Sequence, residues 1–131
     1  MPILIFLMTI FSSPLFGEWT KVIESTSSGN QIYVDFDSIS MNEGFLYYYS
    51  LTNYKKPVFG DLSIVVYTQA DCKLSREKGV RWIFYKGQMG DGESLIENTQ
   101  DQDWTYPSSS TSSSSKEVVL AKVCDYIVTE K

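Results

Sequence analysis

The sequence predicts an α+β domain in which a single antiparallel sheet of five to six strands carries a C-terminal helix on one face. Short runs of β-branched and aromatic residues are separated by Gly, Asn and Asp, which is typical of strands joined by turns. The links between these runs are too short for parallel crossovers. After the last run the apolar residues change to a helical spacing.

Composition limits the function classes. The chain has 131 residues, of which 43% are hydrophobic and 15% aromatic, so one folded domain is expected and disorder is excluded. The net charge of -5 disfavours a nucleic-acid partner. The absence of histidine excludes Ser-His-Asp and Cys-His catalysis and a His-ligated zinc site. Most familiar active sites are therefore excluded, and no metal site is expected. A carboxylate pair for glycoside hydrolysis stays open, which leaves a hydrolase as the third and least favoured interpretation, but nothing in the sequence singles out such a pair.

Residues 1–17 are expected to form a signal peptide. They contain no charged side chain, and the apolar run 3–11 has the length of a signal-peptide core, too short to span a bilayer. Gly17 is a small residue suited to the position before the cut, which leaves Glu18 first in the mature domain, 18–131. The alternative is a buried N-terminal strand or helix. An exported protein is predicted, in the periplasm, on the cell surface or secreted, with no transmembrane segment after cleavage.

Five strands are expected within the mature domain. They are Trp19–Glu24, Gln31–Val34, Phe45–Tyr54, Asp61–Cys72 and Gly79–Lys86. Turns rich in Gly and Asn separate several of them, because these residues tolerate a positive φ or bond their own backbone.

The C-terminal helix is predicted beyond a serine-rich connector at 108–115, which holds too little apolar surface to order itself. The helix has an apolar stripe at offsets 0, 3, 4 and 7, formed by Leu120, Val123, Cys124 and Ile127. Ser114 and Glu117 match a capping box at its start. Several β-branched residues favour a strand instead, but the cap and the stripe favour a helix.

The two cysteines, Cys72 and Cys124, are expected to form a disulfide, because the predicted compartment is oxidising. Such a bridge would attach the helix to the sheet. The alternative is a redox or metal-binding thiol pair, but the C-x-x-C spacing is lacking.

One helix covers only one face of such a sheet, so the opposite face is a candidate binding or homodimer surface. Tyrosine is enriched at interfaces, since its ring adds contact area while its hydroxyl stays hydrogen-bonded. The residues predicted for this surface are Tyr48, Tyr67, Ile83, Tyr85, Arg81 and Lys56. The alternative is that they only form the solvated face of the sheet.

Two other patterns in the sequence are compared with known ligand-binding motifs by their residue order. The loop with Gly87, Gly90 and Gly92 lacks the Lys-Ser/Thr ending of a phosphate-binding loop and is interpreted as a structural tight turn. A following acidic segment does not match the EF-hand order and is interpreted as a solvated loop rather than a calcium site. Its acidic residues are Asp91, Glu93, Glu97, Asp101 and Asp103.

Several sequence pieces together resemble the surface-adhesin protein E family. They are Tyr33-Val34-Asp35, Ser38-Ile39, Leu51-Thr52-Asn53-Tyr54-Lys55-Lys56-Pro57, Asp71-Cys72, Tyr85-Lys86-Gly87-Gln88-Met89-Gly90-Asp91-Gly92, Trp104 and Val123-Cys124. Their order covers about 33 to 124. The serine tract after Pro107 departs from the family pattern and lengthens a loop.

The resemblance implies an exported bacterial protein with a small antiparallel sheet and a helix tied to it by a disulfide. It also implies adhesion to host matrix proteins, and haem binding. Because the chain has no histidine, a His-ligated haem is excluded and only Tyr or Met could serve as axial ligand, so no cofactor is expected.

The function predicted on this basis is a non-enzymatic, exported cell-envelope binding protein. It would bind a protein or an extracellular-matrix type of ligand through the helix-free face, with a homodimer as another use of that face. The alternative is a periplasmic protein that binds a small ligand or assists envelope assembly.

Overall fold

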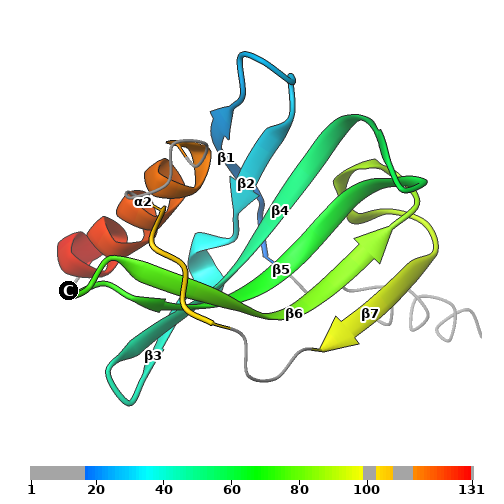
Figure 1. Ribbon diagram of the computed structural model, residues 1–131. Helices are drawn as coiled ribbons and strands as arrows, with labels where there is room; N and C mark the ends of the chain where they lie inside the picture. The colour runs from blue at the N-terminus through cyan, green and yellow to red at the C-terminus, as the bar shows by residue number, and fades with distance from the viewer. Residues whose placement is uncertain (1–16, 99–102, 108–113, 131) are drawn as a thin grey trace, which may run out of the picture.

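The computed structural model describes residues 17–98, 103–107 and 114–130 (Figure 1). The elements are β1 (Thr20–Glu24), β2 (Gln31–Val34), η2 (Phe36–Ser38), β3 (Ser40–Asn42), β4 (Phe45–Val58), β5 (Asp61–Asp71), β6 (Arg76–Tyr85), η3 (Gln88–Gly90), β7 (Ser94–Asn98) and α2 (Ser114–Glu130). The predicted signal peptide therefore lies outside the described residues, except for Gly17. Positions 108–113 of the predicted connector lie outside them too.

The strands of the described residues all belong to one antiparallel sheet in the order β1-β2-β4-β5-β6-β7, and β3 pairs with β4 off this path. The predicted fold class is confirmed. Prediction missed β3 and β7. The first is only three residues long, and the second lies in the segment that was interpreted as an acidic loop.

Strand ends differ from prediction by more than one residue at two places. β4 continues to Val58 through a register shift after Asn53. β6 begins at Arg76, three residues earlier than predicted, because Arg76 pairs with Asp71 across the turn. The Arg76 Nε donates to Asp71 Oδ2 at 2.9 Å and so closes this hairpin.

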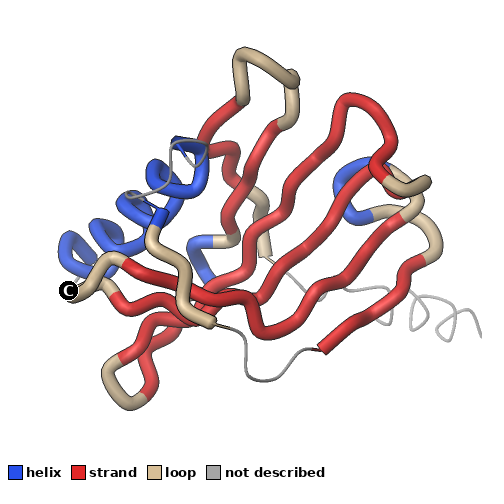
Figure 2. Tube along the Cα trace, viewed as in Figure 1, coloured by secondary structure: helices blue, strands red, loops and turns tan. Residues whose placement is uncertain are grey.

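The helix α2 lies against one end of one face of the sheet (Figures 1 and 2). Its predicted apolar stripe is confirmed, because all four stripe residues belong to or pack on the core beneath it. The buried residues of this core are Val34, Leu46, Tyr48, Ala70, Val119, Leu120 and Val123. Two residues assigned to the connector, Ser114 and Ser115, are instead the first residues of the helix.

The opposite face has an apolar centre of its own. Leu51, Val65 and Ile83 are adjacent in the register of β4, β5 and β6, and all three are buried. Half-buried rings pack against them, namely Trp19, Tyr33, Tyr49 and Tyr85. The sheet therefore separates two small cores, of which α2 covers one.

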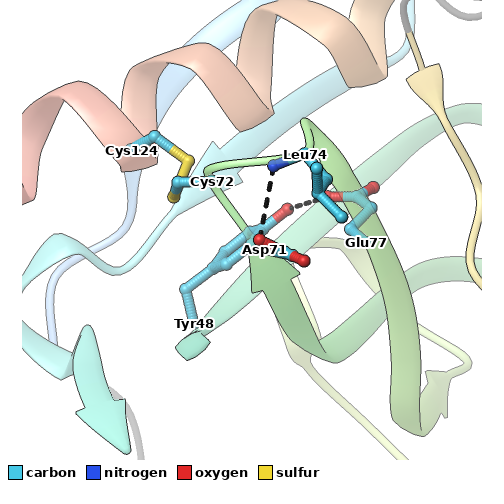
Figure 3. Close-up of a disulfide and its surroundings, with 6 residues drawn as sticks. All are labelled: Tyr48, Asp71, Cys72, Leu74, Glu77 and Cys124. Atoms are coloured by element: carbon cyan, nitrogen blue, oxygen red, sulfur yellow. Dashed lines mark hydrogen bonds between the residues drawn. A yellow bond between two sulfur atoms is a disulfide. The ribbon is translucent and has the colours of Figure 1, made fainter. Parts of the chain in front are cut away.

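The predicted disulfide is confirmed. The sulfur atoms of Cys72 and Cys124 are bonded and the two Cα atoms lie 5.8 Å apart (Figure 3). Cys72 lies directly after β5 rather than within it, so the bridge ties the end of a central strand to the middle of α2. Of the helices that the structure describes, none has the length and apolarity needed to cross a membrane.

Asp35 is a buried carboxylate at the end of β2, with 0% of its surface exposed. The backbone amide of Gly17 donates to its Oδ2 at 2.6 Å. Its other oxygen, Oδ1, is buried and accepts no hydrogen bond in the described part of the chain. A buried carboxylate normally accepts several hydrogen bonds. The bond from Gly17 therefore attaches the N-terminal end of the described domain to the end of β2.

Candidate functional site

Three tyrosines cluster on the face of the sheet turned away from α2. Tyr49 and Tyr67 are register partners on β4 and β5, and their ring centroids lie 4.5 Å apart. The ring of Tyr47 lies 5.8 Å from that of Tyr67. Arg81 is the register partner of Tyr67 on β6. We call these four residues the tyrosine face.

The environment of the tyrosine face raises the pKa of Tyr67. Burial raises the pKa of Tyr67, and the neighbouring rings of Tyr49 and Tyr47 raise it further, against smaller opposing effects of Ser40 and Arg81. At neutral pH Tyr67 is therefore an uncharged hydrogen-bond donor on an aromatic surface. Arg81 is exposed, and its Nε donates to Asn98 Oδ1 at 3.0 Å. This combination of rings and donors suits contact with another macromolecule.

Four of the six residues predicted for this surface share the face. Tyr67 and Arg81 belong to the tyrosine face, while Ile83 and Tyr85 follow Arg81 at alternate positions of β6. Ile83 is only 5% exposed, so it supports the surface from within the apolar centre. Tyr85 is half-buried, and this burial raises its pKa.

The prediction for Tyr48 is wrong, because this residue is on the opposite face. It is 2% exposed and belongs to the core under α2. The register pairs Tyr49, not Tyr48, with Tyr67, and adjacent residues of a strand point to opposite faces. The sequence alone left this register open. Alternation places Tyr47 and Tyr49 on the same side as Leu51, but only the register shows that this side is turned away from α2, so these two residues were missed.

Lys56 is exposed but does not join the tyrosines. It lies in the outer part of β4, in the stretch where the pairing with β5 shifts register. It lies seven positions along the strand from Tyr49, which corresponds to roughly 20 Å. The predicted grouping of Lys56 with Tyr67 and Arg81 is therefore wrong.

The glycine loop after β6 folds back onto the helix-free face. Ser63 Oγ donates to the Gly87 carbonyl at 2.7 Å and accepts from the Gly90 amide at 2.8 Å. Gly90 has a φ of 75°, and a Cβ there would lie 3.4 Å from Leu51. The loop thus covers the end of this face beyond the tyrosines, and its glycines allow the close approach.

The acidic residues that follow are described by the structure only in part. Glu97 lies in β7, not in a loop, and Asp101 lies outside the described residues. In the part of the chain that the structure describes, no group of three potential metal ligands is found.

A polar contact on the helix side was not foreseen. The hydroxyl of Tyr48 donates to Glu77 Oε1 at 2.9 Å (Figure 3). Glu77 is 8% exposed, and burial raises its pKa, although the bond from Tyr48 and the charge of Lys116 act in the opposite direction. The alternating pattern around Tyr48 gave no signal for this acid, since Glu77 preceded the predicted start of its strand.

A family model described as surface-adhesin protein E matches residues 19–125. The chain belongs to this family. Because the family consists of surface adhesins, the chain is a surface-adhesin-like protein. A search of curated protein sequences gave no significant match.

Solved structures of Haemophilus influenzae protein E share the adhesin E fold. One matches with a TM-score of 0.62 at 15% identity, covering 86% of this chain and 87% of that one. A second crystal form gives 0.57 at 18% identity, with 86% and 94% covered. Protein E from non-typeable Haemophilus influenzae gives 0.55 at 16% identity, with 86% and 81% covered. At such identities the likeness concerns the fold alone.

Proposed function

We propose that this chain is an exported, non-enzymatic adhesin that binds a macromolecular partner through the tyrosine face. The single observation that carries the proposal is the cluster of Tyr47, Tyr49 and Tyr67 beside Arg81, on the face turned away from α2. Membership of a surface-adhesin family supports the same class of function.

The chemistry of the tyrosine face favours a protein partner. Tyr and Arg are the residue types that contribute most binding energy at protein interfaces. The rings provide contact area with little conformational entropy to lose, because their neighbours already hold them. Tyr85 and the glycine loop extend the same face toward its far end.

Export is part of the proposal. Residues 1–17 would be removed as a signal peptide, and the disulfide would form after export, because structural disulfides form and persist in oxidising compartments. Protease added to intact cells should digest the protein if it is displayed on the surface. Protection from protease would favour the periplasmic alternative.

The binding surface is tested with cells that express the full-length chain and with immobilised extracellular-matrix proteins. The double variant Tyr67→Ser/Tyr85→Ser should reduce binding at least about tenfold, as the loss of interface anchors does. Phe59→Ser is the matched control, because it removes an exposed ring from the tip of the β4–β5 hairpin. Equal binding by both variants and the unmodified protein would refute the proposed surface, and a change in sedimentation would assign it to a homodimer.

A further inference from the structure

The helix side of the sheet contains a pocket of about 200 Å³ that the proposed adhesive surface does not use. It opens where α2 stops covering the sheet, between the first half of the helix and strands β4, β5 and β6. Its volume is below the range of about 300–1,000 Å³ that holds drug-sized ligands, so any occupant is small. The pocket lining includes Ser50, Thr52, Thr68, Glu77, Trp82 and Lys116.

The pocket exists because small residues occupy the middle of this face. Thr68 pairs with Tyr48 on one side and with Gly79 on the other. Ser50 and Thr52 follow Tyr48 at alternate positions of β4, where a core would normally place larger apolar side chains. Closely packed interiors rarely leave such space. Hydroxyl groups therefore line a hollow beside a well-packed core.

Trp82 forms an aromatic wall of the pocket. A Cβ placed on Gly79 would overlap the Trp82 ring, so the indole lies against the bare backbone of the same strand. Gly79 does not have a positive φ, and the close approach of the ring is the reason that only glycine fits. The ring is half-buried and is part of the pocket surface.

Three charged residues line the pocket, namely Glu77, Lys78 and Lys116. The ammonium of Lys78 lies 4.6 Å from the centroid of the Trp104 ring, which is not part of the lining, so Glu77 and Lys116 are the opposite charges that a ligand would meet.

Glu77 is buried beside the pocket and holds the Tyr48 hydroxyl, and the ammonium of Lys116 on α2 interacts electrostatically with it. A cationic ligand would be opposed by Lys116, and an anionic ligand by Glu77. An apolar ligand would leave the hydroxyls of Ser50 and Thr52 without partners, which is costly when they are buried.

We propose that this pocket binds a small, neutral, polyhydroxylated ligand, namely a single sugar ring or the terminal sugar of a glycan. The hydroxyls and Lys116 supply donors, the Glu77 carboxylate supplies an acceptor, and Trp82 supplies an apolar surface for the C–H face of the ring. The pocket lies on the face opposite to the tyrosine face, so its function is independent of the proposed protein contact.

The test is a titration of the ¹⁵N-labelled full chain followed by NMR. The probes are glucose, galactose and N-acetylglucosamine, each raised to about 50 mM, because affinities near the millimolar range are expected for so small a ligand. Choline and phosphate serve as cationic and anionic probes. We expect saturable shifts of the Trp82 indole N–H and the Gly79 amide with at least one sugar, and none with choline or phosphate.

Two variants test the assignment of the pocket. Thr52→Val keeps the shape of the side chain but removes a hydroxyl, and Ser50→Ala does the same at the neighbouring site. Each should weaken sugar binding at least about fivefold, which corresponds to the loss of one hydrogen bond. Thr26→Val, on an exposed turn, is the matched control and should bind as the unmodified chain does. The proposal is overturned if no sugar shifts these signals, if choline or phosphate shifts them instead, or if the pocket variants bind normally.

Discussion

Tyr48 on β4 reaches across β5 and donates a hydrogen bond of 2.9 Å to Glu77 on β6. The two residues are 29 positions apart in the chain, and both are buried. This contact links two strands that are not neighbours in the sheet and fixes the polar edge of the core beneath α2 (Figure 3).

Removing this hydroxyl should destabilise the fold. Tyr48→Phe leaves the buried Glu77 carboxyl without its donor, so the free energy of unfolding should fall by about 1–3 kcal/mol, measured by urea denaturation. Tyr33→Phe is the control, because it removes a partly exposed bond to Gln31 and should cost less. An equal loss of free energy of unfolding in the two variants would show that the buried Tyr48 bond stabilises the fold no more than the partly exposed Tyr33 bond does.

Stability should also depend on pH through Glu77. Burial raises the pKa of the folded-state carboxyl above 4.5, so between 4.5 and the raised value the folded state binds more protons than the unfolded state. Stability due to this group therefore falls as the pH rises through that interval. Glu77→Gln should remove this fall, and its stability relative to the unmodified chain should increase above pH 4.5 and then level off.

The measurement for Glu77 is a series of urea unfolding curves between about pH 4 and pH 8, the interval in which a raised carboxyl titrates. Glu97→Gln, on the exposed strand β7, serves as the control and should give a curve parallel to that of the unmodified chain. A constant difference between Glu77→Gln and the unmodified chain across the range would contradict the prediction.

The disulfide should contribute much of the stability. It joins residues 52 positions apart, for which the chain-entropy model gives about 4 kcal/mol. Cys72→Ser/Cys124→Ser should therefore lower the free energy of unfolding by that order, and reduction of the unmodified protein should have the same effect. A loss below about 1 kcal/mol in both experiments would mean that the helix is held mainly by its apolar core.

The contact of Gly79 with Trp82 predicts a compensating pair of substitutions. Gly79→Ala places a methyl group in the volume of the indole, so it should destabilise the fold by about 1–3 kcal/mol, the usual cost of overpacking. In a chain that already carries Trp82→Leu, the same change should cost much less. Thermal unfolding is measured for the unmodified chain, the two single variants and the double variant. If the losses of stability in the two single variants simply add up in the double variant, the proposed overlap of the Gly79 Cβ with the indole is excluded.

The tip of the β4–β5 hairpin should tolerate, and even gain from, substitution. Phe59 has a φ of 51° and is followed by Gly60 at 83°, which matches a turn that favours Asn before Gly. Phe59 is 97% exposed, so its ring contributes little to folding. Phe59→Asn should raise the free energy of unfolding by about 0.5–1 kcal/mol. Phe59→Ala, which keeps an unfavourable residue type at this φ, should not, and an equal gain from alanine would refute the explanation.

Much of the fold was predictable because its signals are local. The apolar stripe through Leu120 and Val123 requires only helical periodicity, and the pairing of Cys72 with Cys124 required only that the chain hold two cysteines in an oxidising compartment. Alternation along β5 and β6 correctly placed Tyr67, Arg81 and Ile83 on one face.

The parts that were missed depend on tertiary register. Tyr47, Tyr48 and Tyr49 are identical residues in sequence, and only the pairing of Tyr49 with Tyr67 decides which of them is buried. The contact between Tyr48 and Glu77 depends in turn on that register and on the early start of β6. No periodicity within a single strand carries this information.

The hydrogen bond between Gly17 and the buried Asp35 gives a chemical meaning to the place where a leader would be cut. The proposed cleavage after Gly17 would remove the neutral amide that donates to Asp35 and would create a positively charged ammonium on Glu18, next in the chain. A buried carboxylate with an unsatisfied oxygen favours a cation over an amide. An ammonium that reached Asp35 would replace the neutral contact of the precursor with an ion pair, and β1 would then be held more firmly after processing than before it.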